Sequence, residues 1–328
     1  MGNAKRLAVG AALGGLAYYI HAQRSVRRFE SVEPGDARGP GAYLDIEGRR
    51  VHYVEAGTGE PVVLIHGWNG STFSFRHVIP ELAQAGYRAV AIDLFGYGYS
   101  TRDPDADYSI TGQAHLVSAV MARLGIQRAA VIGHSMGGAV AMRLAIGHPE
   151  RVGRLILVDS VSAGQMRRGR GPGRLLRPLL PVIATLTLHR ESFRMRALRS
   201  AAHDPAFATP NVAEGYFRPM RVAGHLRAQG IMFSQRGRDE PLDPSTVRKP
   251  TLILWGEHDR WLPLSHGEAL ARLIPGARLV PVPSAGHLPL EEQPAFCNRR
   301  VLEFLREDAP ASDGASETAG VRHSPIRR

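Results

Sequence analysis

Cysteine is the residue that this sequence has least of, because only Cys297 occurs among 328 residues. A single cysteine excludes an intrachain disulfide framework and a metal site built from several thiolates. The sequence also lacks an H-E-x-x-H pattern, a G-x-G-x-x-G pattern and a Walker sequence. These patterns hold zinc, a dinucleotide and a nucleotide phosphate, respectively. We therefore expect no metal and no cofactor.

Acidic residues are also scarce, since 30 Asp and Glu face 41 Lys and Arg, which leaves a net charge of +11. Most of the surplus lies in residues 162–248, with 15 Arg against 6 acidic residues. Five of these arginines form a cluster: Arg167, Arg168, Arg170, Arg174 and Arg177. The cluster is either a solvated loop or a docking site for an anionic membrane surface. No nucleic-acid-binding motif accompanies it, so we do not expect nucleic acid as a partner.

Long apolar runs are few, and the longest uncharged one, Leu7 to Gln23, has 17 residues. That length is at the lower limit for crossing a bilayer. Residues 1–28 are interpreted first as a membrane anchor that leaves the body of the protein in the cytoplasm, because positive charge is heavier after the run. A cleaved signal peptide, and hence export, is the second interpretation, since Ile20-His21-Ala22 resembles a cleavage site. An ordinary packed helix is the third.

The chain after this segment alternates between apolar runs of strand length and amphipathic stretches of helix length. Residues 29–41, rich in Gly and Pro, are interpreted as a linker, and the polar residues 307–328 as a disordered tail. Eight strands are expected near residues 43–46, 51–54, 61–65, 89–92, 129–132, 154–159, 251–255 and 279–282. Strands alternating with helices predict a mostly parallel sheet, in residues 42–161 and 249–306, with ligands at the carboxyl ends of its strands.

The segment 133–138 reads Gly-His-Ser-Met-Gly-Gly and stands between an expected strand and an expected helix. A sharp turn at this place exposes the hydroxyl of Ser135. Gly133 and Gly137 are the small residues that let strand and helix approach each other. Ser135 is therefore a candidate nucleophile.

This segment, together with His66-Gly67-Trp68 and the Asp93-x-x-Gly96-x-Gly98-x-Ser100 pattern, resembles the α/β-hydrolase superfamily. The resemblance implies an eight-stranded α/β-hydrolase fold with a helical cap at 162–248, inserted after the sixth strand. Within that cap, helices are expected over 191–202 and 212–233. It also implies an oxyanion hole made by the backbone N–H groups of Trp68 and Met136.

Two later motifs supply an acid and a base in the chain order expected for this fold. Asp259 follows the seventh strand and His287 follows the eighth. His287 would take the proton of the serine hydroxyl, and Asp259 would orient the imidazole. Glu257 and Asp159 are rivals for the role of the acid. Candidate substrate-pocket residues are Trp68, His134, Tyr216, Phe217, Met220 and Phe233.

A serine at this turn disfavours epoxide opening and halide removal, which use a carboxylate there. We expect hydrolysis of a carboxylic ester with a hydrophobic or lipid-like group through an acyl-enzyme, in a serine esterase or lipase-like enzyme. Relatives with the same triad leave three alternatives: carbon–carbon bond hydrolysis of ring-fission products, proline iminopeptidase activity and cofactor-free haloperoxidase activity. From another class, a non-catalytic binding protein of the same fold is the remaining alternative. The sequence does not indicate an oligomeric state.

Overall fold

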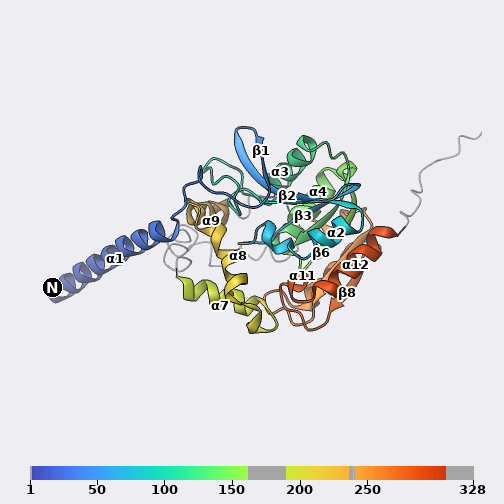
Figure 1. Cartoon of the computed structure of the whole chain (residues 1–328). Helices are drawn as coiled ribbons and strands as arrows, with labels where there is room; N and C mark the ends of the chain where they lie inside the picture. Colours follow the sequence, from blue (N-terminus) through green and yellow to red (C-terminus); the bar gives the residue numbers. More distant parts are fainter. Residues whose placement is uncertain (1, 162–189, 236–238, 240, 308–328) are drawn as a thin grey trace, which may run out of the picture.

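The computed structural model describes residues 2–161, 190–235, 239 and 241–307 and contains one eight-stranded sheet (Figure 1). The strand order is β1-β2-β4-β3-β5-β6-β7-β8. The pairs β1–β2 and β2–β4 are antiparallel and all other pairs are parallel. The strands are β1 (Ala42–Ile46), β2 (Arg49–Ala56), β3 (Glu60–Ile65), β4 (Tyr87–Ile92), β5 (Ala129–His134), β6 (Val152–Val158), β7 (Thr251–Gly256) and β8 (Arg278–Val282). The expected fold class and all eight expected strands are confirmed.

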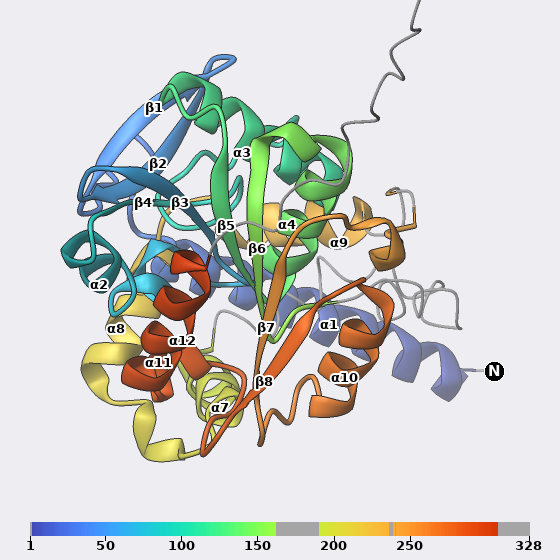
Figure 2. The same cartoon turned by 90° about the vertical axis from the view of Figure 1, so that its right-hand side faces the viewer.

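Helices cover both faces of this sheet (Figure 2). The core helices are η1 (Thr72–Phe75), α2 (Ile79–Gln84), α3 (Ile110–Arg123), α4 (Met136–Gly147), η2 (Pro149–Arg151), η6 (Pro244–Thr246), α10 (Leu264–Leu273), α11 (Pro289–Glu292) and α12 (Pro294–Arg306). Val63 and Ile65 of β3 pack in one apolar cluster with α3, α4 and α10, while Val62 and Leu64 pack in a second cluster with α2 and α12. Because alternate residues face opposite sides, the central strands are apolar throughout.

The described residues between β6 and β7 are largely helical, which is consistent with a cap after the sixth strand. They contain α7 (Glu191–Ala201), η5 (Pro205–Phe207), α8 (Pro210–Met220) and α9 (His225–Gln235). The single helix expected over 212–233 is wrong, because the chain breaks at Gly224, whose φ of +88° suits glycine. The arginine cluster at 167–177 lies outside the described residues.

The N-terminal segment forms a single helix, α1 (Gly2–Phe29), which projects from the body in Figure 1. Within the described residues, no helix combines the length and the apolar character needed to cross a membrane. Three glycines, two tyrosines, a histidine and a glutamine dilute the apolar run from Leu7 to Gln23. The anchor prediction for residues 1–28, the transmembrane helix, and the membrane-associated localisation that rested on it are therefore wrong.

The end of α1 and the following residues pack against the cap. Ala22 and Val26 are buried, whereas Leu13 and Leu16 are more than half exposed. Val32 pairs with Val222 just before α9. The carboxylate of Glu30 accepts hydrogen bonds from the amides of Gly224 (2.9 Å) and Leu226 (2.7 Å). The segment expected to be a linker is thus in contact with the cap over part of its length.

Candidate active site

The turn between β5 and α4 presents Ser135 in a backbone conformation that few non-glycine residues adopt, with φ +52° and ψ −115°. Two glycines allow this turn to pack tightly. A Cβ atom on Gly137 would lie 2.1 Å from the carbonyl oxygen of Ile65, and one on Gly133 would lie 2.4 Å from that of Gly137. Both substitutions would displace backbone. The turn therefore depends on glycine at both positions.

Ser135, His287 and Asp259 form one chain of hydrogen bonds. The Ser135 Oγ lies 2.9 Å from His287 Nε2, and His287 Nδ1 lies 2.7 Å from Asp259 Oδ2. The other carboxylate oxygen of Asp259 accepts hydrogen bonds from the amides of Trp261 (2.8 Å) and Leu262 (2.9 Å). These donors fix the carboxylate so that it faces the imidazole. All three side chains are buried.

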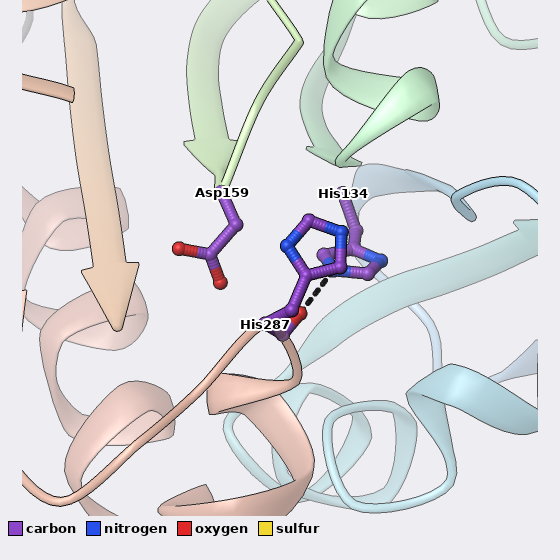
Figure 3. Close-up of side chains that lie close together, drawn as sticks. All are labelled: His134, Asp159 and His287. Carbon is purple, nitrogen blue, oxygen red and sulfur yellow. Dashed lines mark hydrogen bonds between the residues drawn. The ribbon is translucent and has the colours of Figure 1, made fainter. Parts of the chain in front are cut away.

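The loop that carries His287 is held on two sides. The backbone amide of His287 donates a hydrogen bond to the carbonyl of Ala201 at the end of α7 (2.6 Å). The backbone carbonyl of His287 accepts a hydrogen bond from Nε2 of His134 (2.7 Å; Figure 3). Burial, and then the neighbouring His287, lower the pKa of His134 to about 3. His134 is therefore neutral at physiological pH. Its ring supports the His287 loop, a contact that the sequence did not indicate.

The backbone amides of Trp68 and Met136 lie on the two loops expected to form an oxyanion hole. Met136 is the first residue of α4, so its amide precedes any acceptor within that helix. The loop after β3 is fixed by His66, whose Nε2 accepts from the Leu94 amide (3.1 Å). Its Nδ1 therefore carries the proton and donates to the Gly67 carbonyl (2.8 Å). In the described part of the chain, neither the Trp68 amide nor the Met136 amide donates a hydrogen bond to another loop.

The cap contacts this oxyanion loop through α9. The indole N–H of Trp68 donates to the side-chain oxygen of Gln229 (2.7 Å), which is 1% exposed. The ring of Phe233 lies against the Trp68 ring, with centroids 5.9 Å apart. Sequence reasoning missed Gln229, because an amide within a helical pattern gives no signal of its partner. Trp68 and Phe233, both expected pocket residues, are brought together here.

The other expected pocket residues lie elsewhere in the cap. Tyr216, Phe217 and Met220 are buried in a cluster with Leu198 of α7 and Leu288. The Tyr216 hydroxyl donates to Glu291 and lies 3.4 Å from Ser74 Oγ. Burial raises the pKa of Tyr216 well above its usual value, and it stays protonated. In this structure these three residues pack the cap onto the His287 loop.

Asp159, one of the rivals for the acid, also lies near the imidazole. One of its oxygens and a ring nitrogen each of His134 and His287 lie within 4.8 Å of one another (Figure 3). Residues of these types can bind a metal. However, both ring nitrogens of His287 are already hydrogen-bonded, one to Asp259 and one to Ser135. We therefore do not infer a metal site from this group.

Residues 60–294 match the alpha/beta hydrolase fold family, and this match covers more than half of the chain. The chain belongs to that family. It is 30% identical over 271 residues to a 2-hydroxy-6-oxo-6-phenylhexa-2,4-dienoate hydrolase from Comamonas testosteroni, an alignment that covers 80% of this chain and 93% of the relative. The protein is therefore a hydrolytic enzyme of this fold.

Two solved structures are informative. A variant of the meta-cleavage product hydrolase CumD, known from Pseudomonas fluorescens, is similar with a TM-score of 0.67 and 27% identity, over 82% of this chain and 98% of the other. A membrane phospholipase A is similar with a TM-score of 0.67 and 25% identity, over 93% of this chain and 96% of the other. These similarities give two substrate classes to weigh.

Proposed function

We propose that this α/β hydrolase is a serine hydrolase that forms an acyl-enzyme at Ser135. The observation that carries the proposal is the hydrogen-bond chain from Ser135 Oγ through His287 to Asp259, at 2.9 Å and 2.7 Å. A serine hydroxyl is a weak nucleophile at neutral pH, and a base within hydrogen-bond reach is what activates it. Ser135 and His287 are 152 positions apart in the sequence, and Asp259 and His287 are 28 positions apart. Only the fold therefore brings the three residues together.

In the first half-reaction, the Ser135 Oγ attacks the carbonyl carbon of the substrate while His287 Nε2 takes the hydroxyl proton. Asp259 stabilises the imidazolium that forms. The tetrahedral intermediate collapses, the bond to the leaving group breaks, and His287 returns its proton to the leaving atom. Water then attacks the acyl-enzyme with His287 again as base. The acid product leaves and the Ser135 hydroxyl is restored.

The amides of Trp68 and Met136 are suited to bind the oxyanion of each tetrahedral intermediate. Met136 stands at the N-terminus of α4, where the helix dipole also favours negative charge. Removing one such donor typically costs about 10²–10³ in kcat. This contribution applies to any substrate with a carbonyl group, so it does not distinguish between bond types.

The comparisons favour hydrolysis of a carbon–carbon bond in a ring-fission product as the first candidate reaction. The Comamonas relative and CumD both carry names for that activity. A 2-hydroxy-6-oxo-dienoate has a ketone that Ser135 could attack, and the leaving group is then a carbon atom that receives the proton from His287. The same catalytic residues serve this reaction without change.

Hydrolysis of a carboxylic ester, including a lipid ester, is the second candidate. The phospholipase A resembles a larger share of this chain, 93%, than CumD does, 82%. In addition, Gln229 and Phe233, two side chains in contact with the Trp68 indole, carry no charge. A dienoate carries a carboxylate that a cation would bind best, whereas neutral walls suit the acyl chain of an ester.

A substrate panel measured on the full chain and on Ser135→Ala tests the proposal and separates the two candidates. The panel contains a 2-hydroxy-6-oxo-dienoate, p-nitrophenyl esters of short and long acids, and a monoacylglycerol. We expect turnover of at least one class, with loss of that turnover in Ser135→Ala. A dienoate kcat/KM far above that for every ester assigns carbon–carbon hydrolysis, and the reverse assigns ester hydrolysis. Turnover that survives in Ser135→Ala contradicts the proposal.

A further inference from the structure

The cap meets the loop of the catalytic base at the C-terminal end of α7. The backbone there, from Ser200 to His203, lies directly against the backbone of residues 286–287. The His287 amide donates to the Ala201 carbonyl (2.6 Å). A Cβ atom on Gly286 would lie 2.5 Å from that carbonyl oxygen and 2.6 Å from the His203 amide nitrogen. Only glycine at position 286 lets the two backbones approach this closely.

The side chain of Glu292 joins these two backbone segments. Glu292 is the last residue of α11, the short helix that follows the His287 loop. Its Oε2 accepts a hydrogen bond from the His203 amide (2.6 Å), and its Oε1 accepts one from the Gly286 amide (2.9 Å). The Glu292 backbone is fixed in turn, because its amide donates to the Leu288 carbonyl (2.9 Å). Glu292 therefore bridges the cap and the residue directly before His287.

The same end of α7 also contacts the loop of the catalytic acid, through Trp261. The Trp261 amide donates to Asp259 Oδ1 (2.8 Å), and its indole N–H donates to Ser200 Oγ (3.1 Å). The indole ring lies beside the His287 ring, with centroids 5.1 Å apart. A shift of this end of the cap would therefore be transmitted to the surroundings of both the acid and the base.

A carboxylate that accepts two amides can serve folding alone, and the location of these amides is what points further. The amides of two consecutive residues, Gly286 and His287, are held, one by Glu292 and one by the Ala201 carbonyl. Fixing both amides fixes the direction in which the His287 side chain leaves the backbone. His287 Nε2 lies 2.9 Å from Ser135 Oγ, a distance that a small rotation of this backbone would lengthen.

We propose that Glu292 is a positioning residue for His287, which ties the catalytic base to the cap. This inference rests on the proposed serine hydrolase function. By holding the loop and the cap together, Glu292 keeps the imidazole within reach of the Ser135 hydroxyl. A displaced imidazole takes and returns protons less effectively whatever the leaving group is. Misplacing a catalytic group by about 1 Å can cost about 10²-fold in rate.

The test compares Glu292→Ala with a matched control, Asp239→Ala, in the full-length protein. Asp239 also accepts two backbone amides, from Ile110 (3.1 Å) and Thr111 (2.8 Å) at the start of α3. We expect Glu292→Ala to lower kcat by at least about tenfold, because the base is displaced, and to change KM by less than about threefold. Labelling of Ser135 by a fluorophosphonate should slow by a similar factor. Asp239→Ala should be destabilised as well but should keep kcat within about threefold of the wild type.

Wild-type kcat and labelling rate in Glu292→Ala would overturn the proposal. A rise in KM alone would also overturn it, because Glu292 would then hold only the cap. Chemical denaturation gives the stability of both variants, and equal losses of kcat in both would assign the effect to stability and overturn the positioning role. If Glu292→Ala does not fold, Glu292→Gln, which keeps one acceptor oxygen, takes its place with the same outcomes. Failure of the proposed function differs, since wild-type turnover would then survive in Ser135→Ala.

Discussion

The two sides of the active site are built in different ways. On the sheet side, the proposed nucleophile, base and acid follow β5, β8 and β7, respectively. Backbone amides or a neighbouring ring contact each of these three residues. On the cap side, α9 reaches the site through one hydrogen bond, from Trp68 to Gln229, and one ring contact, from Trp68 to Phe233. The sheet side therefore fixes the chemistry. The cap also contacts the sheet side at the His287 loop, where the Ala201 carbonyl of the cap accepts a hydrogen bond from the His287 amide.

The cap itself depends on a part of the chain outside the matched family region, residues 60–294. Glu30 caps the start of α9 by accepting two backbone amides, and Val32 pairs with Val222 just before it. Carboxylates at a helix N-terminus are stabilising because of the free N–H groups and the helix dipole. The N-terminal segment is thus a support of the cap.

The largest effect should follow Ser135→Ala on the sheet side. Removing the nucleophile while keeping the fold should lower kcat by about 10⁵–10⁶-fold. Steady-state kinetics on whichever substrate the panel identifies measures this loss. Ser234→Ala, an exposed serine in α9, serves as the control and should retain wild-type activity. A residual rate within about tenfold of the wild type would contradict the role of Ser135.

A smaller effect is expected on the cap side from Gln229→Met, which keeps the length of the side chain but not the acceptor. The buried Trp68 N–H would lose its partner, an effect of about 1–3 kcal/mol. We expect kcat to fall by about tenfold with little change in KM, because the oxyanion loop is less well fixed. Trp68→Phe combined with Gln229→Met should be less damaging than the sum of the two single changes. Strict additivity would show that the two residues act independently.

A smaller effect again is expected from Glu30, which supports the cap, and it concerns the free energy of unfolding. Glu30→Ala removes the acceptor for the Gly224 and Leu226 amides and should lower the free energy of unfolding by about 1 kcal/mol, as loss of a helix cap does. Chemical denaturation measures it. The exposed Glu33, changed to alanine, is the control and should have almost no effect. Equal stabilities for the two variants would mean that Glu30 does not hold α9.

The smallest effect concerns the pH dependence of stability at the start of α9. Burial, followed by the charge of Arg102, lowers the pKa of His225 to about 3 from an unfolded value of 6.5. A depressed folded pKa means stability that is present above the unfolded pKa and is lost as the pH falls toward the folded pKa. Between about pH 7.5 and about pH 6.0 the wild type should lose about 0.8 kcal/mol more than His225→Gln. Urea unfolding at both pH values would show parallel losses if His225 has no such role.

The sheet was predictable from the sequence because its central strands are apolar runs bounded by turn residues. Val62 to Ile65, buried on both faces, illustrates this pattern. The glycines and the serine at 133–137 were also informative, since a turn this tight accepts few other residues. The order of Ser135, Asp259 and His287 then agreed with that of the fold. The catalytic roles of these residues remain predictions until activity is measured.

The cap and the N-terminal segment were predicted less well, for a physical reason. The contacts of Gln229 with Trp68, and of Glu30 with Gly224, join residues 161 and 194 positions apart. Local patterns carry no trace of such pairings. The apolar run in α1 was taken for a membrane span because of its length and flanking charges. The glycines and polar side chains of this run make it too weakly apolar to cross a membrane. In addition, Ala22 and Val26 are buried against the body of the protein.

The central claim, an acyl-enzyme at Ser135, is tested most directly by labelling with a fluorophosphonate probe followed by peptide mapping. A fluorophosphonate reacts with a serine only when the serine is activated by a base and the oxyanion is stabilised. We predict a single probe adduct on the peptide that contains Ser135, lost in Ser135→Ala and strongly reduced in His287→Ala. An adduct on another residue, or labelling that persists in Ser135→Ala, would contradict the account.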